Sequence, residues 1–316
     1  MNIDRSTFLA GAAALAALPV AGARASASDL LVKTGLIPAD IGAAAVFARE
    51  LGYFHDAGID VEIETMQSGP AIAPAVLGGT LSVGAMNSGS LAGARERGLP
   101  VLYFAPAAMT PPSSLANAML VRSDSPIHSG ADMNGKTVGI VGVKTLEHAC
   151  MLLWVDKHGG DSKTLKFTEL PYGEMSAALQ ANRIDICLAS EPFATLDRGP
   201  NRIVAGVFSA MPAPFISYGY FATEAWLNAN AAIAMKYAAA IHRASIWANA
   251  HRRESGQMVA AFTKLDPSLV ESMARTQYAT SLDASAIQPA VDVMVQYGML
   301  PATIDAHALI WKPAKA

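Results

Sequence analysis

The side chains of this 316-residue chain that could do chemistry are mostly hydrogen-bond donors that follow predicted strands. Asn87-Ser88-Gly89 follows the apolar segment 81–86, and Lys144-Thr145 follows the strand-like segment 137–143. A strand that turns into a helix leaves unpaired backbone N–H groups and the positive end of a helix dipole at the carboxyl edge of a parallel sheet. We therefore expect these turns to bind a small polar ligand, with ordinary helix capping as the alternative role.

The same topology places one turn after each predicted strand around a single groove. The predicted ligand-binding residues are Thr34, Gly35, Gln67, Ser68, Gly69, Met86, Asn87, Ser88, Gly89, Met109, Lys144, Thr145, Tyr172, Glu191 and Tyr218. Lys144 could neutralise an anionic ligand, and Glu191 could bind an ammonium or hydroxyl group. A solvated surface position for Lys144 and a helix cap for Glu191 remain the alternatives.

No arrangement of residues is typical of catalysis or of a metal centre. The 7 histidines are scattered, and Ser88 and Ser90 lack the strand-nucleophile-helix pattern of hydrolases. We expect no catalytic residue, no metal and no cofactor. Cys150 and Cys187 have neither metal nor redox spacing. Two separate buried thiols are the favoured interpretation, with a disulfide as the alternative that an oxidising compartment would permit.

The first 27 residues have the pattern of an export signal. Arg5 precedes an apolar core from Phe8 to Val20, and Ala23-Arg-Ala-Ser-Ala27 has the small residues of a cleavage site. Ser6 stands where a twin-arginine signal would have its second arginine, so the general secretory and twin-arginine routes both stay open. We expect cleavage near Ala27 and a periplasmic product.

Composition argues against some partners and indicates the number of domains. The formal net charge of −3 becomes −4 when Arg5, Arg24 and Asp4 leave with the signal. That charge is too mild to favour nucleic acid or an anionic membrane as the partner. A mature chain of about 290 residues exceeds what one compact core usually serves, so we expect two domains.

Hydrophobic periodicity divides the mature chain into two strand–helix series and a helical end. The first series runs to about residue 116, the second starts at 137, and a nearly all-helical part follows 224, including one helix over 267–278. Repeated βα winding favours mainly parallel sheets.

Two segments look like crossings between these series. They are 116–122 and 216–222. The predicted domains are therefore lobe 1 at 28–117 plus 220–316 and lobe 2 at 118–219.

Several segments together resemble one family of exported proteins. They are Phe47-Ala-Arg-Glu-Leu-Gly-Tyr-Phe-His-Asp-Ala-Gly-Ile-Asp-Val-Glu62, the segment 77–90, Asp132-Met-Asn-Gly-Lys136, Ser190-Glu-Pro-Phe193 and the segment 287–298. In order and spacing they are similar to the solute-binding proteins of nitrate, sulfonate and taurine importers and to their thiamine-pyrimidine-precursor relatives.

The resemblance implies an α/β type II periplasmic-binding fold, with two doubly wound βαβ lobes joined by two crossings and a helical C-terminal wrap. It also implies that the lobes close over a solute and deliver it to an ABC permease in the inner membrane. We expect a monomer that binds a small organic solute, with an aromatic or heteroaromatic body and a carboxylate or sulfonate head. The protein would have no enzymatic activity.

Two alternatives stay open. Thiamine-pyrimidine synthases share the fold of this family, but their cysteine-dense iron-binding motif is missing here. A ligand presenter for a membrane sensor would have the same groove.

Overall fold

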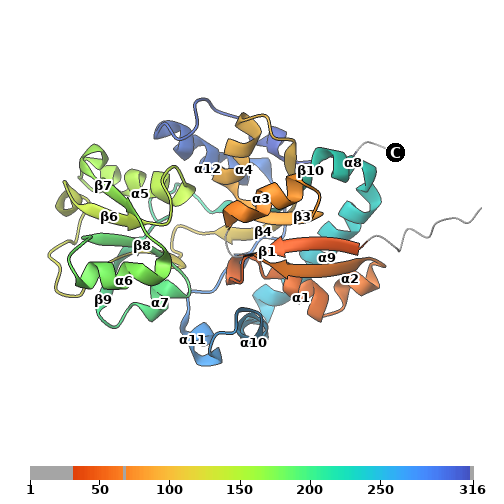
Figure 1. The fold of residues 1–316 in the computed structure, drawn as a ribbon, viewed down its shortest axis with the longest axis horizontal. Helices are drawn as coiled ribbons and strands as arrows, with labels where there is room; N and C mark the ends of the chain where they lie inside the picture. The colour runs from red at the N-terminus through yellow and green to blue at the C-terminus, as the bar shows by residue number, and fades with distance from the viewer. Residues whose placement is uncertain (1–30, 67–68, 314–316) are drawn as a thin grey trace, which may run out of the picture.

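The computed structural model describes residues 31–66 and 69–313. The predicted export signal and the predicted ligand residues Gln67 and Ser68 lie outside these ranges. Figure 1 shows two bodies side by side, each built around its own sheet, with the C-terminal helices packed mainly on the first body.

The first sheet has the strand order β11-β4-β10-β3-β1-β2. Its strands are β1 (Leu31–Leu36), β2 (Asp60–Thr65), β3 (Val83–Asn87), β4 (Val101–Thr110), β10 (Phe215–Thr223) and β11 (Gln277–Tyr278). β1 is parallel to both β2 and β3, but β10 lies antiparallel between β3 and β4. The sheet is therefore mainly parallel as expected, because β1, β2, β3 and β4 run in one direction. β10 and β11 are the antiparallel exceptions, and β10 is one because the chain returns from the second sheet through the middle of the first.

Helices cover both faces of the first sheet. They are α1 (Ala44–Glu50), α2 (Tyr53–Asp56), α3 (Gly69–Leu77), α4 (Ser88–Glu96), α8 (Glu224–Ala229), α9 (Ala231–Ala250), α10 (Arg252–Thr263), α11 (Pro267–Ser272) and α12 (Ala284–Gln296), with 3-10 turns η1 (Asp40–Gly42) and η4 (Ala306–Leu309). Successive residues of a strand point to opposite faces. Tyr220 accordingly packs with Phe47 and Tyr237 on the α1/α9 side, and Phe221 packs with Ile287 on the α12 side.

The second sheet has the order β7-β6-β8-β5-β9. Its elements are β5 (Asn117–Arg122), β6 (Thr137–Ile140), β7 (Lys166–Glu169), β8 (Ile186–Ser190), β9 (Asn201–Gly206), α5 (Leu146–Lys157), α6 (Tyr172–Gln180), α7 (Phe193–Leu196), η2 (Ala131–Met133) and η3 (Ser162–Thr164). β6 is parallel to β7 and β8, whereas β5 is antiparallel to β8 and β9. The carboxyl ends of β6 and β8 therefore meet at one edge, as a ligand site in an open α/β sheet requires.

The two passages between the sheets lie just before the segments expected to form them. Residues 117–122 are β5 of the second sheet and 215–223 are β10 of the first. The chain thus crosses within 111–116 and 207–214. The apolar patterns of the expected segments belong to buried strands, so the crossing predictions at 116–122 and 216–222 are wrong. The predicted domain boundaries at 117/118 and 219/220 stay a prediction.

The helix expected over 267–278 ends early. α11 begins at Pro267 as expected but ends at Ser272, and Gln277–Tyr278 pair with β4 as β11. Arg275 and Tyr278 both bond the buried carboxylate of Asp40, on η1. This tertiary contact overrides the local helical pattern, since propensity is a weak prior against packing.

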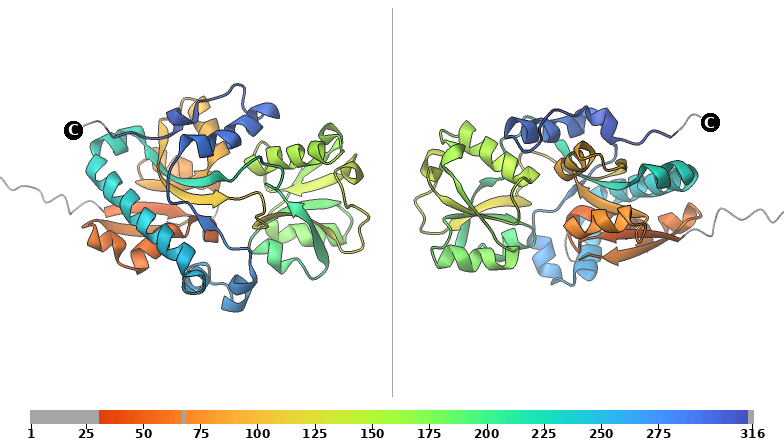
Figure 2. Two further views of the ribbon diagram at one scale, coloured as in Figure 1. Left: turned by 180° about the vertical axis from the view of Figure 1, so that it is seen from behind. Right: turned by 45° about the horizontal axis from the view of Figure 1, so that its top comes forward.

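Two of the C-terminal helices, α11 and α12, also contact the second body (Figure 2). α11 contacts α7, and α12 contacts α5. Tyr297, the residue that follows α12, donates through its hydroxyl to Oδ2 of Asp156 on α5, at 2.7 Å. Cys150 and Cys187 are separate buried thiols, as the favoured interpretation predicts. In the ranges that the structure describes, no helix is both long and apolar enough to cross a membrane.

Candidate functional site

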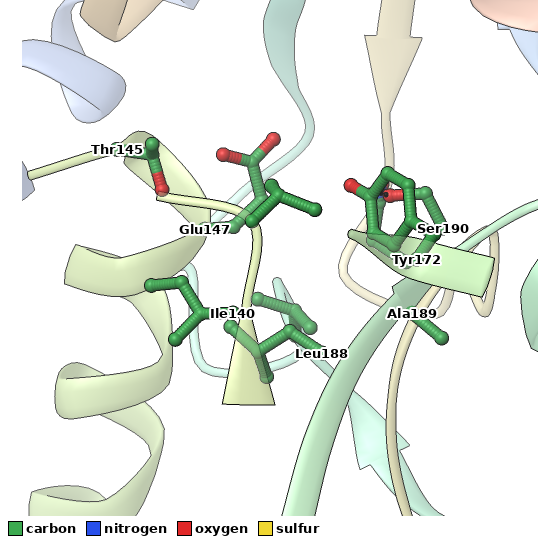
Figure 3. Close-up of a pocket in the computed structure, with 10 residues that line it drawn as sticks. Ile140, Thr145, Glu147, Tyr172, Leu188, Ala189 and Ser190 are labelled. Atoms are coloured by element: carbon green, nitrogen blue, oxygen red, sulfur yellow. Dashed lines mark hydrogen bonds between the residues drawn. The ribbon is translucent and has the colours of Figure 1, made fainter. Parts of the chain in front are cut away.

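A small cavity lies where the carboxyl ends of β6 and β8 meet the start of α5. Its lining residues are Asn117, Ile140, Val141, Thr145, Glu147, Tyr172, Leu188, Ala189, Ser190 and Val207. Figure 3 shows Ile140 and Leu188 at its base, with Glu147 on one side and Tyr172 and Ser190 opposite. The cavity has room for about one water molecule in this conformation.

Hydroxyl and amide groups form one side of this cavity. The hydroxyls of Tyr172 and Ser190 are 2.8 Å apart, and Nδ2 of Asn117 donates to Oγ of Ser190 at 3.2 Å. The Tyr172 ring stacks on Phe193, with the ring centroids 5.5 Å apart. Burial, with a smaller effect of the Glu147 charge, raises the pKa of Tyr172 to about 12. Tyr172 is therefore a neutral hydroxyl that can donate or accept a ligand hydrogen bond.

Glu147 supplies the acidic group of this cavity. It lies in the first turn of α5, after the N-cap Thr145, whose Oγ1 accepts from the backbone N–H of His148 at 3.2 Å. Burial raises the pKa of the Glu147 carboxyl, while hydrogen bonds from its own backbone N–H and from Thr145 oppose that shift. The carboxylate is thus partly desolvated beside the polar group of Tyr172 and Ser190.

A second small cavity lies toward the first sheet. It is lined by Ile41, Ala108, Met109, Thr110, Ser114, Ala116, Asn117, Thr276 and Gln277. Asn117 lines both cavities, so they are neighbours. The Thr110 hydroxyl donates to Oγ of Ser217 at 2.6 Å. Together the two cavities run from the second sheet to β4 of the first.

Three of the predicted ligand residues line these cavities, namely Thr145, Tyr172 and Met109. Ser190, in the predicted Ser-Glu-Pro-Phe turn, lines the first cavity too. The strand-end rule therefore identifies lining residues of both cavities, and their role in ligand binding stays a prediction. The other predicted residues that the structure describes line neither cavity.

Two of those residues use their hydroxyls inside the protein. The fully buried Thr34 hydroxyl lies 3.2 Å from the hydroxyl of Tyr237. Tyr218 donates to the carbonyl of Ala85 at 3.2 Å. The first bond joins α9 to β1 and the second joins the neighbouring strands β10 and β3, so both side chains have structural roles in this conformation.

The Asn-Ser-Gly turn after β3 is a capping motif here. Oδ1 of Asn87 accepts from the backbone N–H of Ser90 at 2.7 Å, which is the alternative role weighed from the sequence. Ser88 is fully buried and donates to the carbonyl of Ile216 at 2.5 Å. The ligand role of this turn stays a prediction, because these groups would have to face the ligand in an opened conformation.

Close packing surrounds Gly35, Met86 and Gly89 among the predicted ligand residues. A Cβ added at Gly35 would lie 2.3 Å from Cδ1 of Leu81, and one at Gly89 would lie 3.3 Å from Cβ of Leu146. Met86 is buried in the core, and Gly69 begins α3. The contact of Gly89 with Leu146 shows that α4 and α5 touch across the two bodies.

The two charged residues predicted for the site have other surroundings. Lys144 is exposed, with a left-handed φ of 60°, and its side chain lies outside both cavities. Glu191 accepts from the Thr195 backbone N–H at 3.0 Å, from the Thr195 hydroxyl at 2.9 Å and from the Ala274 backbone N–H at 3.0 Å. The alternatives of a surface lysine and a helix cap therefore describe this conformation.

In the first cavity, Glu147 and Asn117 are the polar residues that the sequence reasoning missed. In the second cavity it missed Ser114, Thr276 and Gln277. The sequence predicts the turn Lys144-Thr145 after β6, and Glu147 lies two residues beyond it, so extending that turn by two residues finds Glu147. Asn117 begins an antiparallel strand. A rule about carboxyl ends of strands cannot identify it. Within residues 31–66 and 69–313, no group of three acidic, histidine or cysteine side chains could hold a metal ion.

Solved structures with this fold include binding proteins and an enzyme. The periplasmic aliphatic sulphonate binding protein SsuA from Escherichia coli is 19% identical, with a TM-score of 0.73 over 90% of this chain and 93% of its own. A ligand-binding component of an ABC-type import system from Staphylococcus aureus, with zinc bound, is 16% identical, with a TM-score of 0.76 over 90% and 96%. The desulfurization enzyme DSZB is 14% identical, with a TM-score of 0.66 over 90% and 96%. These likenesses confirm the predicted α/β periplasmic-binding fold.

Sequence comparison identifies the family. No curated protein matches this chain in sequence. A family model described as NMT1/THI5 like matches residues 42–255, which is more than half of the chain and includes the strands and helices around the first cavity. The protein therefore belongs to the NMT1/THI5-like family.

Proposed function

We propose that this protein is the solute-binding component of an ABC importer and binds a small organic solute between its two sheets. The observation that carries the proposal is the first cavity, where the Tyr172–Ser190–Asn117 hydrogen bonds lie above the apolar side chains of Ile140 and Leu188. A few placed polar groups beside apolar walls are typical of sites for small organic molecules. The family and the fold support the same function.

Opening of the two bodies is part of this proposal. A cavity with room for about one water molecule cannot hold an organic solute, so binding requires the sheets to move apart. The two bodies share an apolar cluster that includes Leu146 of α5 and Met294 of α12. Hydrogen bonds such as Tyr297 with Asp156 and Glu191 with Ala274 also join them, so opening must separate both kinds of contact. A solute that bridges the bodies would shift the population toward a closed state that a permease can recognise.

The proposed location and partners follow from this role. The export pattern of the first 27 residues favours delivery to the periplasm, where a permease in the inner membrane would receive the solute. We propose a monomer, as expected from the sequence. The mild net charge gives no reason to expect nucleic acid.

Isothermal titration tests the proposal directly. Purified mature protein is titrated with sulfonates, aromatic acids, organic amines, thiamine-precursor pyrimidines and nitrate, alongside a Tyr172→Ala variant. We expect at least one organic solute to bind, with clear weakening in Tyr172→Ala. Tyr53→Ala is the control, since Tyr53 lies on α2 under the Arg243 guanidinium and away from the cavity. Tight nitrate binding with no organic solute bound would contradict the organic part of the proposal.

An enzyme is the second candidate function. The likeness to DSZB and the family name favour it, although the described residues around the cavity hold no nucleophile–base pair. Incubating each bound solute with the protein and analysing products by mass spectrometry tests this alternative. Turnover above a heat-inactivated control would support the enzyme, and intact solute would support the binding protein.

A further inference from the structure

Glu147 is the only charged residue that lines either cavity in the part of the chain that the structure describes. Figure 3 shows its carboxylate pointing away from Ile140 and Leu188, with Tyr172 and Ser190 across the cavity from it. None of the ion pairs formed by the described residues includes Glu147. The acid therefore meets the cavity without a positive partner.

An unpaired, partly buried carboxylate is costly in this position. Desolvation disfavours its charged form, which is why the pKa of Glu147 is raised although Thr145 and its own backbone N–H donate to it. A glutamate in the first turn of a helix benefits from the helix dipole. An exposed side chain would gain the same benefit without desolvation, so the dipole does not explain why the carboxylate faces the cavity.

The neighbours of Glu147 disfavour an anionic ligand. The N-terminus of α5, which could bind an anion, already holds the Glu147 carboxylate. An anionic ligand in the same poorly solvated cavity would be repelled by this carboxylate. No lysine, arginine or histidine lines the cavities to offset that repulsion. Lys144, the cation expected from the sequence, is exposed.

We infer that the solute carries a positively charged nitrogen group, an ammonium or amidinium, which binds the Glu147 carboxylate next to the hydroxyls of Tyr172 and Ser190. Its N–H groups would donate to the carboxylate, and its apolar body would lie against Ile140 and Leu188. This inference rests on the proposed function. It replaces the expected carboxylate or sulfonate head by a head of opposite charge.

Matched charge series test the inference. Wild-type protein is titrated calorimetrically with benzylammonium, benzamidinium, choline and spermidine, with benzyl alcohol as a neutral probe and with benzoate and benzenesulfonate as anionic probes. Each titration is repeated with Glu147→Gln and with Glu174→Gln as the control, because Glu174 is an exposed glutamate in the first turn of α6. We expect cations to bind best and Glu147→Gln to weaken them about 10- to 100-fold, the loss of a hydrogen bond between charged groups.

Each outcome decides between distinct conclusions. Preferred binding of anionic or neutral probes, or cation affinity unchanged in Glu147→Gln, would overturn the inference and leave the proposed function standing. If no probe binds and no solute of the wider titration panel binds, the proposed function fails and the inference fails with it.

The pH dependence of binding separates recognition from a merely structural role. Cation affinity should fall as the pH drops through the pKa of Glu147, because the neutral acid loses the charge that attracts the ligand, and this dependence should vanish in Glu147→Gln. The other titratable groups near the carboxyl are His148, Cys150, Tyr172 and Tyr218, and all four remain in the variant. An identical pH profile in both proteins would show that Glu147 does not contact the ligand.

Discussion

Asp40 and Arg275 form a buried two-point ion pair, with Nε to Oδ2 at 2.9 Å and Nη2 to Oδ1 at 3.0 Å. Their side chains are 6% and 7% exposed. The backbone N–H of Thr276 donates to the same carboxylate at 2.7 Å. This ion pair holds the segment after α11 against the first sheet, and that segment carries the Ala274 N–H to the second body and lines the second cavity.

Asp40→Asn should strongly destabilise the protein. The substitution leaves the Arg275 guanidinium buried without a compensating charge, which typically costs about 3–5 kcal/mol of unfolding free energy. Urea denaturation followed by circular dichroism measures the loss. Asp56→Asn is the matched control, because the Asp56–Arg243 pair is 55% and 57% exposed and such pairs contribute about 0–1 kcal/mol. Equal losses in both variants would contradict the importance of burial.

Glu191→Ala should loosen the contact between the two bodies. It removes the acceptor of the Thr195 and Ala274 backbone N–H groups, and each buried donor left unsatisfied costs about 1–3 kcal/mol. Hydrogen exchange at the amide of Ala274 is the readout, and we expect it to accelerate. Glu174→Ala is the control, as an exposed acid with no such acceptor role. Unchanged exchange at Ala274 would show that the bond does not form in solution.

The sequence predicts the strand-and-helix order well where a pattern is local. The strand–helix series of both bodies and the nearly all-helical part after residue 224 match the expected periodicity, and Gly298 follows α12 with a left-handed φ of 66°, as a C-terminal glycine should. The end of α11 is not local, because a carboxylate more than 230 residues away at Asp40 sets it.

The site was predictable to a similar extent. Thr145 and Tyr172 follow from strand ends, whereas the acid at Glu147 requires knowing which side of a helix faces the cavity. Some predicted ligand donors form hydrogen bonds inside the protein, as the Thr34 hydroxyl does with the hydroxyl of Tyr237. The pattern of a single strand does not predict such a contact with a distant helix.

Gly89→Phe should hold the two bodies apart. A Cβ at this position already lies 3.3 Å from Cβ of Leu146 and 3.4 Å from Cγ of Met294, so an aromatic ring has no space between α4 and α5. We expect a larger radius of gyration by small-angle X-ray scattering and weakened solute binding. Gly199→Phe is the control, because Gly199 is exposed and a Cβ there meets nothing within 4 Å. A wedge variant as compact as the wild type, with full affinity, would argue against closure of the two bodies.

Glu147→Gln should change how the stability of the empty protein depends on pH. The carboxyl pKa is raised on folding above its ordinary value of 4.5. Between these two pKa values the folded state binds more protons than the unfolded state, so unfolding free energy falls as pH rises through that window. The glutamine variant lacks this fall and should become the relatively more stable protein above it. Urea denaturation from pH 4 to 8, about the range where carboxyl and histidine groups titrate, measures the difference.

His148, whose pKa is lowered by burial, is present in both proteins and largely cancels in that comparison. A stability difference between the two proteins that stays constant over the whole pH range would contradict a desolvated carboxyl at position 147.

The most direct test of the central claim is a crystal structure of the protein with its tightest-binding solute from the titrations. We predict electron density for the solute between the two sheets, with a nitrogen atom hydrogen-bonded to the Glu147 carboxylate and its apolar body against Ile140 and Leu188. Density for the solute elsewhere on the protein, with the cavity at Glu147 still closed, would contradict the account.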